Sequence, residues 1–212
     1  MYPFLSILLC LAAIQAQGAP KLPAELVAVE AKYTKAGTLR ADFTQINEIA
    51  ALKQKKTSSG ILSIKRPSKI RWEEQAPEHT LLVSDGRTLW YYTPPFEAGE
   101  RGQVIERKAQ EAQSRLANAL LSGAFSKATK DMKIETTSPT EFTLIPRKGS
   151  AGTVIKAILT LNADAKLIEK VVLEHKEGNR SEITLSKIEL GKELPDAEFR
   201  FTAPPNTDRI KQ

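Results

Sequence analysis

The chain has 212 residues, of which 41% are hydrophobic and 26% are charged, and its formal net charge is +6. This is the composition of a globular protein, and it excludes a low-complexity or disordered chain. The positive charge would suit a membrane surface, a lipid headgroup or a nucleic acid. Because the basic residues are scattered, we interpret them mainly as solvating charges and expect no nucleic-acid partner. Those near the first predicted strands are Lys53, Lys55, Lys56, Lys65, Arg66, Lys69 and Arg71.

The N-terminal segment has the pattern of a secretory signal peptide. Residues 4–14 are apolar apart from Ser6, a run too short for a bilayer, which needs about 20 residues. Ala16 and Gly18 place small residues at the −3 and −1 positions of a signal-peptidase site. We therefore predict a signal peptide over 1–18 and a single mature domain over 19–212; the alternative is a buried N-terminal helix.

The chain contains one cysteine, Cys10, which lies inside the predicted signal peptide. A lipoprotein signal needs small residues before the cysteine, whereas Leu8 and Leu9 stand there. We expect no lipidation at Cys10 and no disulfide, so the mature chain must be held together by its core.

The first predicted elements are a helix and a run of strands. Leu22, Leu26, Val29 and Tyr33 share one stripe of an amphipathic helix over 22–34, and Gly37 suits its end. Alternation over 39–49 predicts a first strand. Four more strands, separated by turn residues, form a predicted antiparallel meander. They cover residues 60–64, 69–73, 80–84 and 88–92.

The second strand of this meander should have two unlike faces. Ile70 and Trp72 share one face because side chains alternate along a strand, and Lys69, Arg71 and Glu73 take the other. The sheet therefore has an apolar face with a large aromatic side chain, and another element must cover it.

A second helix is available for that role. Residues 97–108 are interpreted as a charged loop with one short strand over 104–107, and residues 108–121 have helical composition. Leu116 and Leu120 belong to a narrow apolar stripe on this helix, and Ser122-Gly123 supplies its stop. We expect the stripe to pack on the apolar face of the sheet.

Strand patterns return in the second half of the chain. The predicted strands cover residues 133–137, 141–146, 153–162, 167–175 and 180–190, and a last short strand covers 199–201. About eleven strands in one sheet must curl or close. The sequence thus predicts an incomplete antiparallel β-barrel covered by two or three helices; the alternative is a two-sheet sandwich with the helices outside.

The polar residues give no case for catalysis. His79 and His175 lie on different predicted strands without the spacing of metal ligands, so we expect no metal and no cofactor. A triad could be drawn from His79, Ser84 and Asp85, but Ser84-Asp85-Gly86 is explained by a hairpin turn. We therefore expect no enzyme.

One arginine stands among hydrophobic residues. Arg66 follows Leu62 and Ile64 at period two, so it either continues their apolar face or is a solvated turn residue beside Pro67. On the apolar face, its five N–H donors could bind carbonyl groups of a helical lid or of an ester-bearing ligand.

Several motifs together resemble the LolA family of outer-membrane lipoprotein carriers. The resemblance is strongest over residues 39–96 and returns at the C-terminus. It is carried by Ala41-Asp42-Phe43-Thr44-Gln45, by Lys65-Arg66-Pro67 followed by Trp72, by Leu82-Val83-Ser84-Asp85-Gly86 with Leu89-Trp90-Tyr91, and by Phe199-Arg200-Phe201-Thr202. After the terminal Pro-Pro, where the family usually has glycine, this chain has Asn206.

The resemblance implies a periplasmic carrier with a helical lid over an incomplete barrel. Such a carrier, which we expect to be a monomer, takes the acyl chains of lipoproteins from an inner-membrane ABC transporter to an outer-membrane receptor. The lid-contacting arginine would be Arg66, and the apolar cavity would include Ile70, Trp72 and Leu82. The alternatives are the outer-membrane receptor of the same fold and a periplasmic sensor of lipids or lipoproteins.

Overall fold

The computed structural model describes residues 22–109, 115–147, 151–164 and 166–211. The predicted signal peptide therefore lies outside the described residues. The described helices are α1 (Ala24–Ala36), α2 (Arg115–Leu121) and α3 (Phe125–Ala128), with two 3-10 turns, η1 (Ala50–Leu52) and η3 (Asp196–Phe199). The strands are β1 (Thr38–Ile49), β2 (Gln54–Lys65), β3 (Lys69–Ala76), β4 (Leu81–Ser84), β5 (Thr88–Thr93), β6 (Gly102–Lys108), β7 (Met132–Ser138), β8 (Glu141–Pro146), β9 (Val154–Leu161), β10 (Ile168–His175), β11 (Arg180–Leu190) and β12 (Thr207–Lys211).

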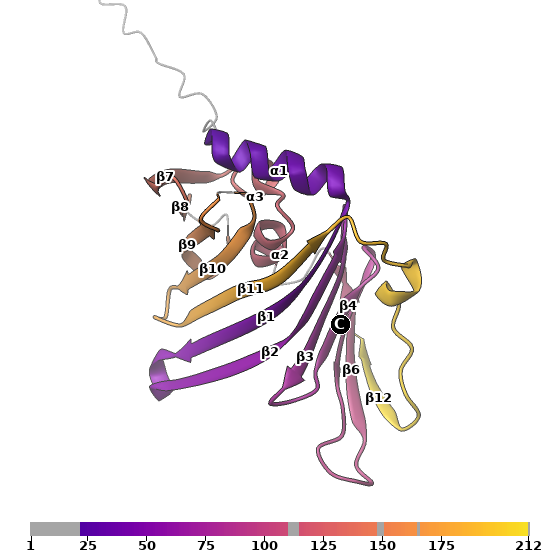
Figure 1. The fold of residues 1–212 in the computed structure, drawn as a ribbon. Coiled ribbons are helices and arrows are strands. Elements are labelled where there is room, and N and C mark those ends of the chain that lie inside the picture. Colours follow the sequence, from indigo (N-terminus) through magenta and orange to yellow (C-terminus); the bar gives the residue numbers. More distant parts are fainter. Residues whose placement is uncertain (1–21, 110–114, 148–150, 165, 212) are drawn as a thin grey trace, which may run out of the picture.

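All twelve described strands belong to one curved sheet (Figure 1). Their order is β12-β6-β5-β4-β3-β2-β1-β11-β10-β9-β8-β7. Neighbours pair antiparallel except β12, which runs parallel to β6. The sheet does not close, because β12 and β7 form its two edges. The predicted incomplete barrel is confirmed, with one strand more than expected, and the sandwich alternative is wrong.

Helix α1 covers one end of the curved sheet, and local sequence explains its limits (Figure 1). Leu26, Val29 and Tyr33 are at most 2% exposed, as the predicted stripe requires. Gly37 adopts a left-handed conformation (φ 73°) and donates its N–H to the backbone oxygen of Tyr33. This is the usual helix stop, and it turns the chain directly into β1.

Helices α2 and α3 lie inside the curve of the sheet, so its concave face holds the main core (Figure 1). The side chains of Leu120, Leu121 and Phe125 are fully buried, as is Phe142 from β8. They belong to one continuous hydrophobic cluster with the concave faces of β1–β3 and β8–β11.

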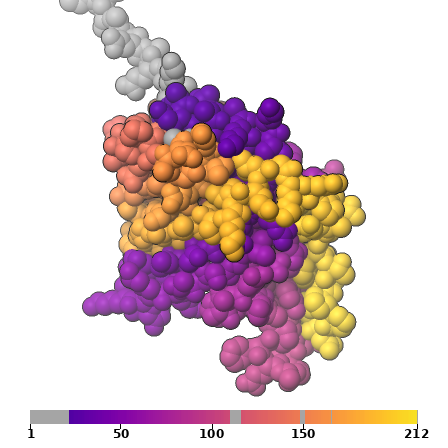
Figure 2. Space-filling model, in the orientation of Figure 1, coloured from indigo at the N-terminus to yellow at the C-terminus, as the bar shows by residue number. Residues whose placement is uncertain are grey.

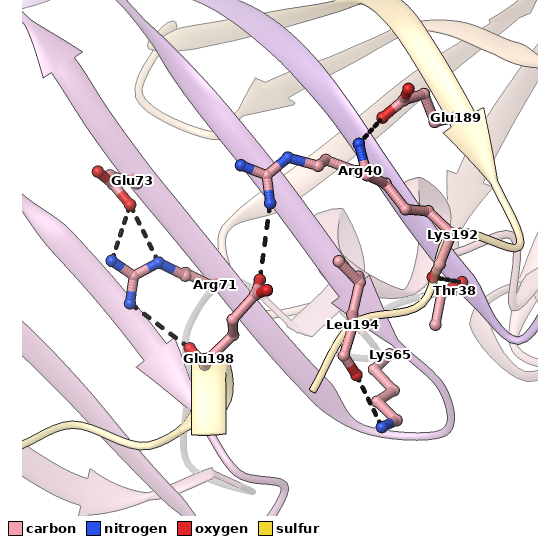
Figure 3. A network of polar contacts seen from close by, with 9 residues as sticks. All are labelled: Thr38, Arg40, Lys65, Arg71, Glu73, Glu189, Lys192, Leu194 and Glu198. Carbon is pink, nitrogen blue, oxygen red and sulfur yellow. Dashed lines mark hydrogen bonds and ion pairs between the residues drawn. The ribbon is translucent and has the colours of Figure 1, made fainter. Parts of the chain in front are cut away.

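The part of the convex face formed by β1–β3 is covered by the C-terminal arm, residues 191–206. Leu194 and Phe199 are at most 2% exposed and lie outside the concave cluster. The arm is held to β1–β3 by polar contacts that include Lys65 to the Leu194 carbonyl, Arg71 to the Glu198 carbonyl and Arg40 to the Glu198 carboxylate (Figure 3).

Two predictions about secondary structure are wrong. Residues 199–201 form no strand: Phe199 ends η3, which lies across β3 rather than beside a free sheet edge. The last strand is β12 instead, paired with β6. The helix predicted from residue 108 also begins later, because Lys108 pairs with Thr88 as the end of β6.

Asn206 adopts the left-handed conformation, with φ 59°. Asparagine tolerates this region better than most residues, so it takes over the turn for which glycine would be usual. Of the helices that the structure describes, none is long and apolar enough to cross a membrane.

Candidate functional site: a helix-covered concave face

An apolar row crosses β3 to β6 on the concave face. The pairing places Trp72 opposite Leu82, Leu82 opposite Tyr91, and Tyr91 opposite Ile105. Trp72, Leu82 and Ile105 are partly exposed, and Tyr91 is 40% exposed. We call α2 and α3 the cover of the concave face. The cover leaves the outer part of this row accessible to solvent, whereas the inner part of the concave face is buried.

Trp72 is held against Phe43 of β1. The ring centroids are 3.8 Å apart at an interplanar angle of 33°. Between them on β2, Gly60 lies opposite Phe43, and a Cβ on Gly60 would come 1.9 Å from the backbone oxygen of Glu73. Only glycine lets β3 approach this closely, so Gly60 helps to position the aromatic pair.

The structure brings the apolar residues predicted for the site into one cluster. Leu62, Ile64, Ile70 and Leu120 are at most 6% exposed within it. Trp72, Leu82 and Leu116 are partly buried and pack against the same cluster. Sheet and helix residues thus meet on the concave face. Their role in binding acyl chains stays a prediction.

Arg66 lies on the helix side of the sheet, in the turn between β2 and β3. Its guanidinium Nη1 donates a hydrogen bond of 2.5 Å to the carbonyl of Ser122, the residue after α2. Its backbone N–H donates to the Gly37 carbonyl at 2.9 Å, just after α1. Arg66 therefore contacts the chain just after both α1 and α2.

Tyr33 of α1 packs beside the same segment that follows α2. A Cβ on Gly123 would lie 2.9 Å from the Tyr33 ring, so the chain after α2 passes directly beneath it. The phenol oxygen accepts a hydrogen bond from the backbone N–H of Ile168 at 3.0 Å. Burial raises the pKa of Tyr33 to about 12, although this hydrogen bond opposes the increase.

A second polar contact fixes α3 to α1. The Glu30 carboxylate accepts hydrogen bonds from the backbone N–H and the hydroxyl of Ser126, in the first turn of α3. The carboxylate thus satisfies a backbone N–H group in the first turn, where the short helix offers no internal acceptor. Together with Arg66, this contact ties the cover to its surroundings through a few polar groups placed at helix ends.

The sequence did not identify the part of the concave face that β9–β11 form. Leu159, Val171, Leu173, Ile183 and Leu185 of β9–β11 are at most 7% exposed in the same cluster. Alternation in the predicted strands was the available signal. None of these residues stood out, because each looks like an ordinary core position.

Two of the residues considered for catalysis, Ser84 and Asp85, have structural roles in a turn. The Ser84 hydroxyl accepts the Gly86 N–H, and Asp85 accepts the backbone N–H groups of Arg87 and Thr88. Burial tends to raise the pKa of Asp85, but these backbone hydrogen bonds lower it overall. Within the described part of the chain, no cluster of His, Cys, Asp or Glu could hold a metal ion.

Taken together, these features define an incomplete β-barrel whose apolar concave face is covered by helices instead of being closed by strands. The family model "Outer membrane lipoprotein carrier protein LolA" matches residues 34–202. The chain therefore belongs to the LolA family, as its motifs suggested.

Two curated relatives carry the name outer-membrane lipoprotein carrier protein. The one from Azotobacter vinelandii is 31% identical over 181 residues, covering 84% of each chain. The one from Psychromonas ingrahamii is 33% identical over 179 residues, covering 84% of this chain and 82% of its own. Among solved structures, an uncharacterized conserved protein from Thermus thermophilus shares the fold, with a TM-score of 0.51, 12% identity, and coverage of 89% of this chain and 97% of that one.

Proposed function

We propose that this protein is a periplasmic carrier that binds the acyl chains of lipoproteins on its concave face. It would receive them from an inner-membrane ABC transporter and deliver them to an outer-membrane receptor. The observation that carries the proposal is the apolar concave face, covered by short helices that polar contacts hold at their ends. Membership of the lipoprotein carrier family supports it.

The physical need for such a carrier follows from the cost of exposing acyl chains to water. Each buried methylene contributes about 0.8 kcal/mol, so one chain with about 14 methylenes contributes roughly 11 kcal/mol. Unaided transfer between membranes is therefore very slow. A carrier must bury most of the apolar surface of the acyl chains and still release the chains without ATP.

A movable cover solves this problem by competing with the cargo. In the structure, Leu120, Leu121 and Phe125 fill the concave face and are fully buried. When acyl chains displace the cover, these side chains lose their partners on the sheet, which offsets part of the gain from burying the cargo. The loaded state is then only modestly favourable, and the cargo can pass to a receptor.

The two tryptophans allow a direct test of where the acyl chains bind. Trp72 lies on the concave face, opposite Leu82, whereas Trp90 pairs with Val83 on the other face of the sheet. We would load Trp90→Phe and Trp72→Phe proteins with a lipoprotein that carries brominated acyl chains, which quench nearby indoles. Strong quenching is expected in Trp90→Phe, where Trp72 alone emits.

The Trp72→Phe protein is the matched control, because it keeps the emitter on the convex side. Equal quenching in both proteins, or quenching of Trp90 alone, would place the acyl chains elsewhere and contradict the proposal. Wild-type binding without any quenching of Trp72 would also contradict it.

The alternatives have their own tests. A receptor of the same fold would be lipidated, so a diacylated cysteine at the mature N-terminus, seen by mass spectrometry, would end the carrier proposal. Ester or peptide hydrolysis that is abolished by His79→Ala would instead favour an enzyme.

A further inference from the structure

The hairpin between β1 and β2 projects beyond the neighbouring strand β3. We define its tip as residues 49–57. The pairing of β2 with β3 begins only at Ser59, so Gln54–Ser58 have a partner strand on one side alone. Figure 2 shows this segment standing out from the molecular surface, and Figure 1 shows it at the end of β1 far from α1.

The tip presents an exposed apolar side chain. Leu52, at the end of η1, is 61% exposed, and its neighbours Ala50 and Ala51 are also exposed. Lys53 follows with a left-handed backbone (φ 50°) and turns the chain back into β2. An apolar side chain at the apex of this projecting turn is free to contact a partner surface.

Folding sorts the scattered basic residues into two groups. Lys65 and Lys69 pair with Asp196, and Arg71 pairs with Glu73, so these charges serve the fold. The three lysines of the tip remain at the surface. Lys55 pairs with Glu48 but is 69% exposed, and Lys53 and Lys56 are exposed without an ion pair to any described residue; the segment 48–57 thus holds three lysines and one glutamate.

We infer that the hairpin tip binds the surface of an anionic phospholipid membrane. Lysines around a single exposed leucine suit the headgroup layer, where the charges meet lipid phosphates and the leucine enters the acyl boundary. A stable protein interface usually buries about 800 Å² on each side, which one leucine on a convex turn does not offer. The inference does not depend on the proposed cargo.

This surface would set the orientation of the protein on a membrane. Antiparallel pairing places the β1–β2, β3–β4, β5–β6 and β10–β11 loops at the same end of the sheet, opposite the turn that holds Arg66. Contact through the tip therefore turns this loop end toward the lipid. The contact is weak and salt-dependent, because three lysines supply most of it.

The test is co-sedimentation of the mature protein with vesicles free of lipoprotein. Binding to vesicles rich in phosphatidylglycerol should exceed binding to pure phosphatidylcholine vesicles, and 0.5 M salt should abolish most of it, since screening at about that concentration is strong. Lys53→Gln with Lys56→Gln should weaken binding roughly 25-fold, at about fivefold per lysine. Leu52→Ser should weaken it several-fold.

Lys32→Gln with Lys35→Gln is the matched control, because it removes the same charge from exposed positions on α1 at the other end. This control should change binding less than twofold. Equal losses in both double variants would show an effect of net charge alone, and binding no stronger to anionic than to neutral vesicles would also overturn the inference. Because no lipoprotein is present, neither outcome bears on the carrier proposal.

Discussion

Replacing Arg66 with leucine tests how the helical cover is held closed. The guanidinium of Arg66 donates to the Ser122 carbonyl behind α2, and this is the hydrogen bond that joins the β2–β3 turn to the end of the cover. Leucine keeps an apolar stem of similar reach but has no donor. The variant should therefore weaken the closed state while leaving the apolar surface of the sheet unchanged.

The size of the effect follows from the charge on the donor. Hydrogen bonds to charged groups contribute about 1.5–3 kcal/mol. This corresponds to a shift of roughly tenfold to hundredfold toward the open form. Arg66 is partly exposed, so water replaces some of the lost interaction, and we expect the lower end of this range.

The assay measures cargo loading and cargo transfer separately. Arg66→Leu should bind a fluorescent lipoprotein about tenfold more tightly than the wild type, because its cover competes less well. Transfer from the loaded variant to receptor-containing membranes should be slower by a similar factor, because the cover no longer helps to expel the cargo.

Lys69→Leu is the control, since Lys69 belongs to the same hairpin but pairs with Asp196 on the convex face. This variant should load and transfer like the wild type. If Arg66→Leu also transfers at the wild-type rate with unchanged loading, Arg66 is only a solvated turn residue and the reasoning about the cover is refuted.

Three further results are expected. Phe142→Ala, at a fully buried site, should lower the free energy of unfolding by about 3–5 kcal/mol in urea titrations, and a loss under 1 kcal/mol would show that this part of the core is not well packed. The pKa of Tyr33 is about 12 in the folded state against 10.0 ordinarily, so the phenol loses its proton at a lower pH in the unfolded state than in the folded state. The free energy of unfolding that this burial contributes is therefore present below pH 10 and falls between pH 10 and 12. Tyr33→Phe should lack this component of alkaline unfolding. Lys65 and Lys69 lower the pKa of Asp196 to about 2 from 3.8, so the attachment of the C-terminal arm should persist above pH 4 and weaken toward pH 2; Asp196→Asn should speed amide hydrogen exchange in the arm at neutral pH, and an unchanged rate would argue against this ion-pair contact.

Local periodicity was sufficient to predict most of the sheet. Ile70 and Trp72 alternate with charged residues, and the structure places them on the concave face, where they pack with the helices. The side of the sheet on which a residue lies depends on near neighbours in sequence. This is why the strands from β1 to β5, and the two faces of β3, could be predicted from the sequence.

The wrong predictions concern segments whose structure depends on contacts with residues far away in the sequence. Residues 199–201 alternate like a strand, but Phe199 is buried against the convex face, in a segment that crosses the sheet. β12 has no apolar pattern and forms because the edge of β6, about a hundred residues earlier, offers unpaired backbone groups. Neither the position of Phe199 nor the pairing of β12 can be predicted from a local sequence pattern.

The sequence suggested a lid carbonyl as one possible partner of Arg66 but could not show which residue supplies it. The arginine donates to the backbone carbonyl of Ser122, and every residue has such a carbonyl, so no side-chain identity could point to it. The sequence placed Arg66 either on the apolar face or in solvent. The structure was needed to bring the end of α2 to its guanidinium.

The most direct test of the carrier proposal is release of a lipoprotein from membranes into a soluble complex. The mature protein would be incubated with inner membranes that contain the ABC transporter, ATP and a newly made lipoprotein, and the supernatant would be analysed by size exclusion and mass spectrometry. The proposal predicts a soluble one-to-one complex that forms with the wild type and disappears when Leu62→Asp places a charge on the concave face. A lipoprotein that stays in the membrane with a folded, active wild-type protein present would contradict it.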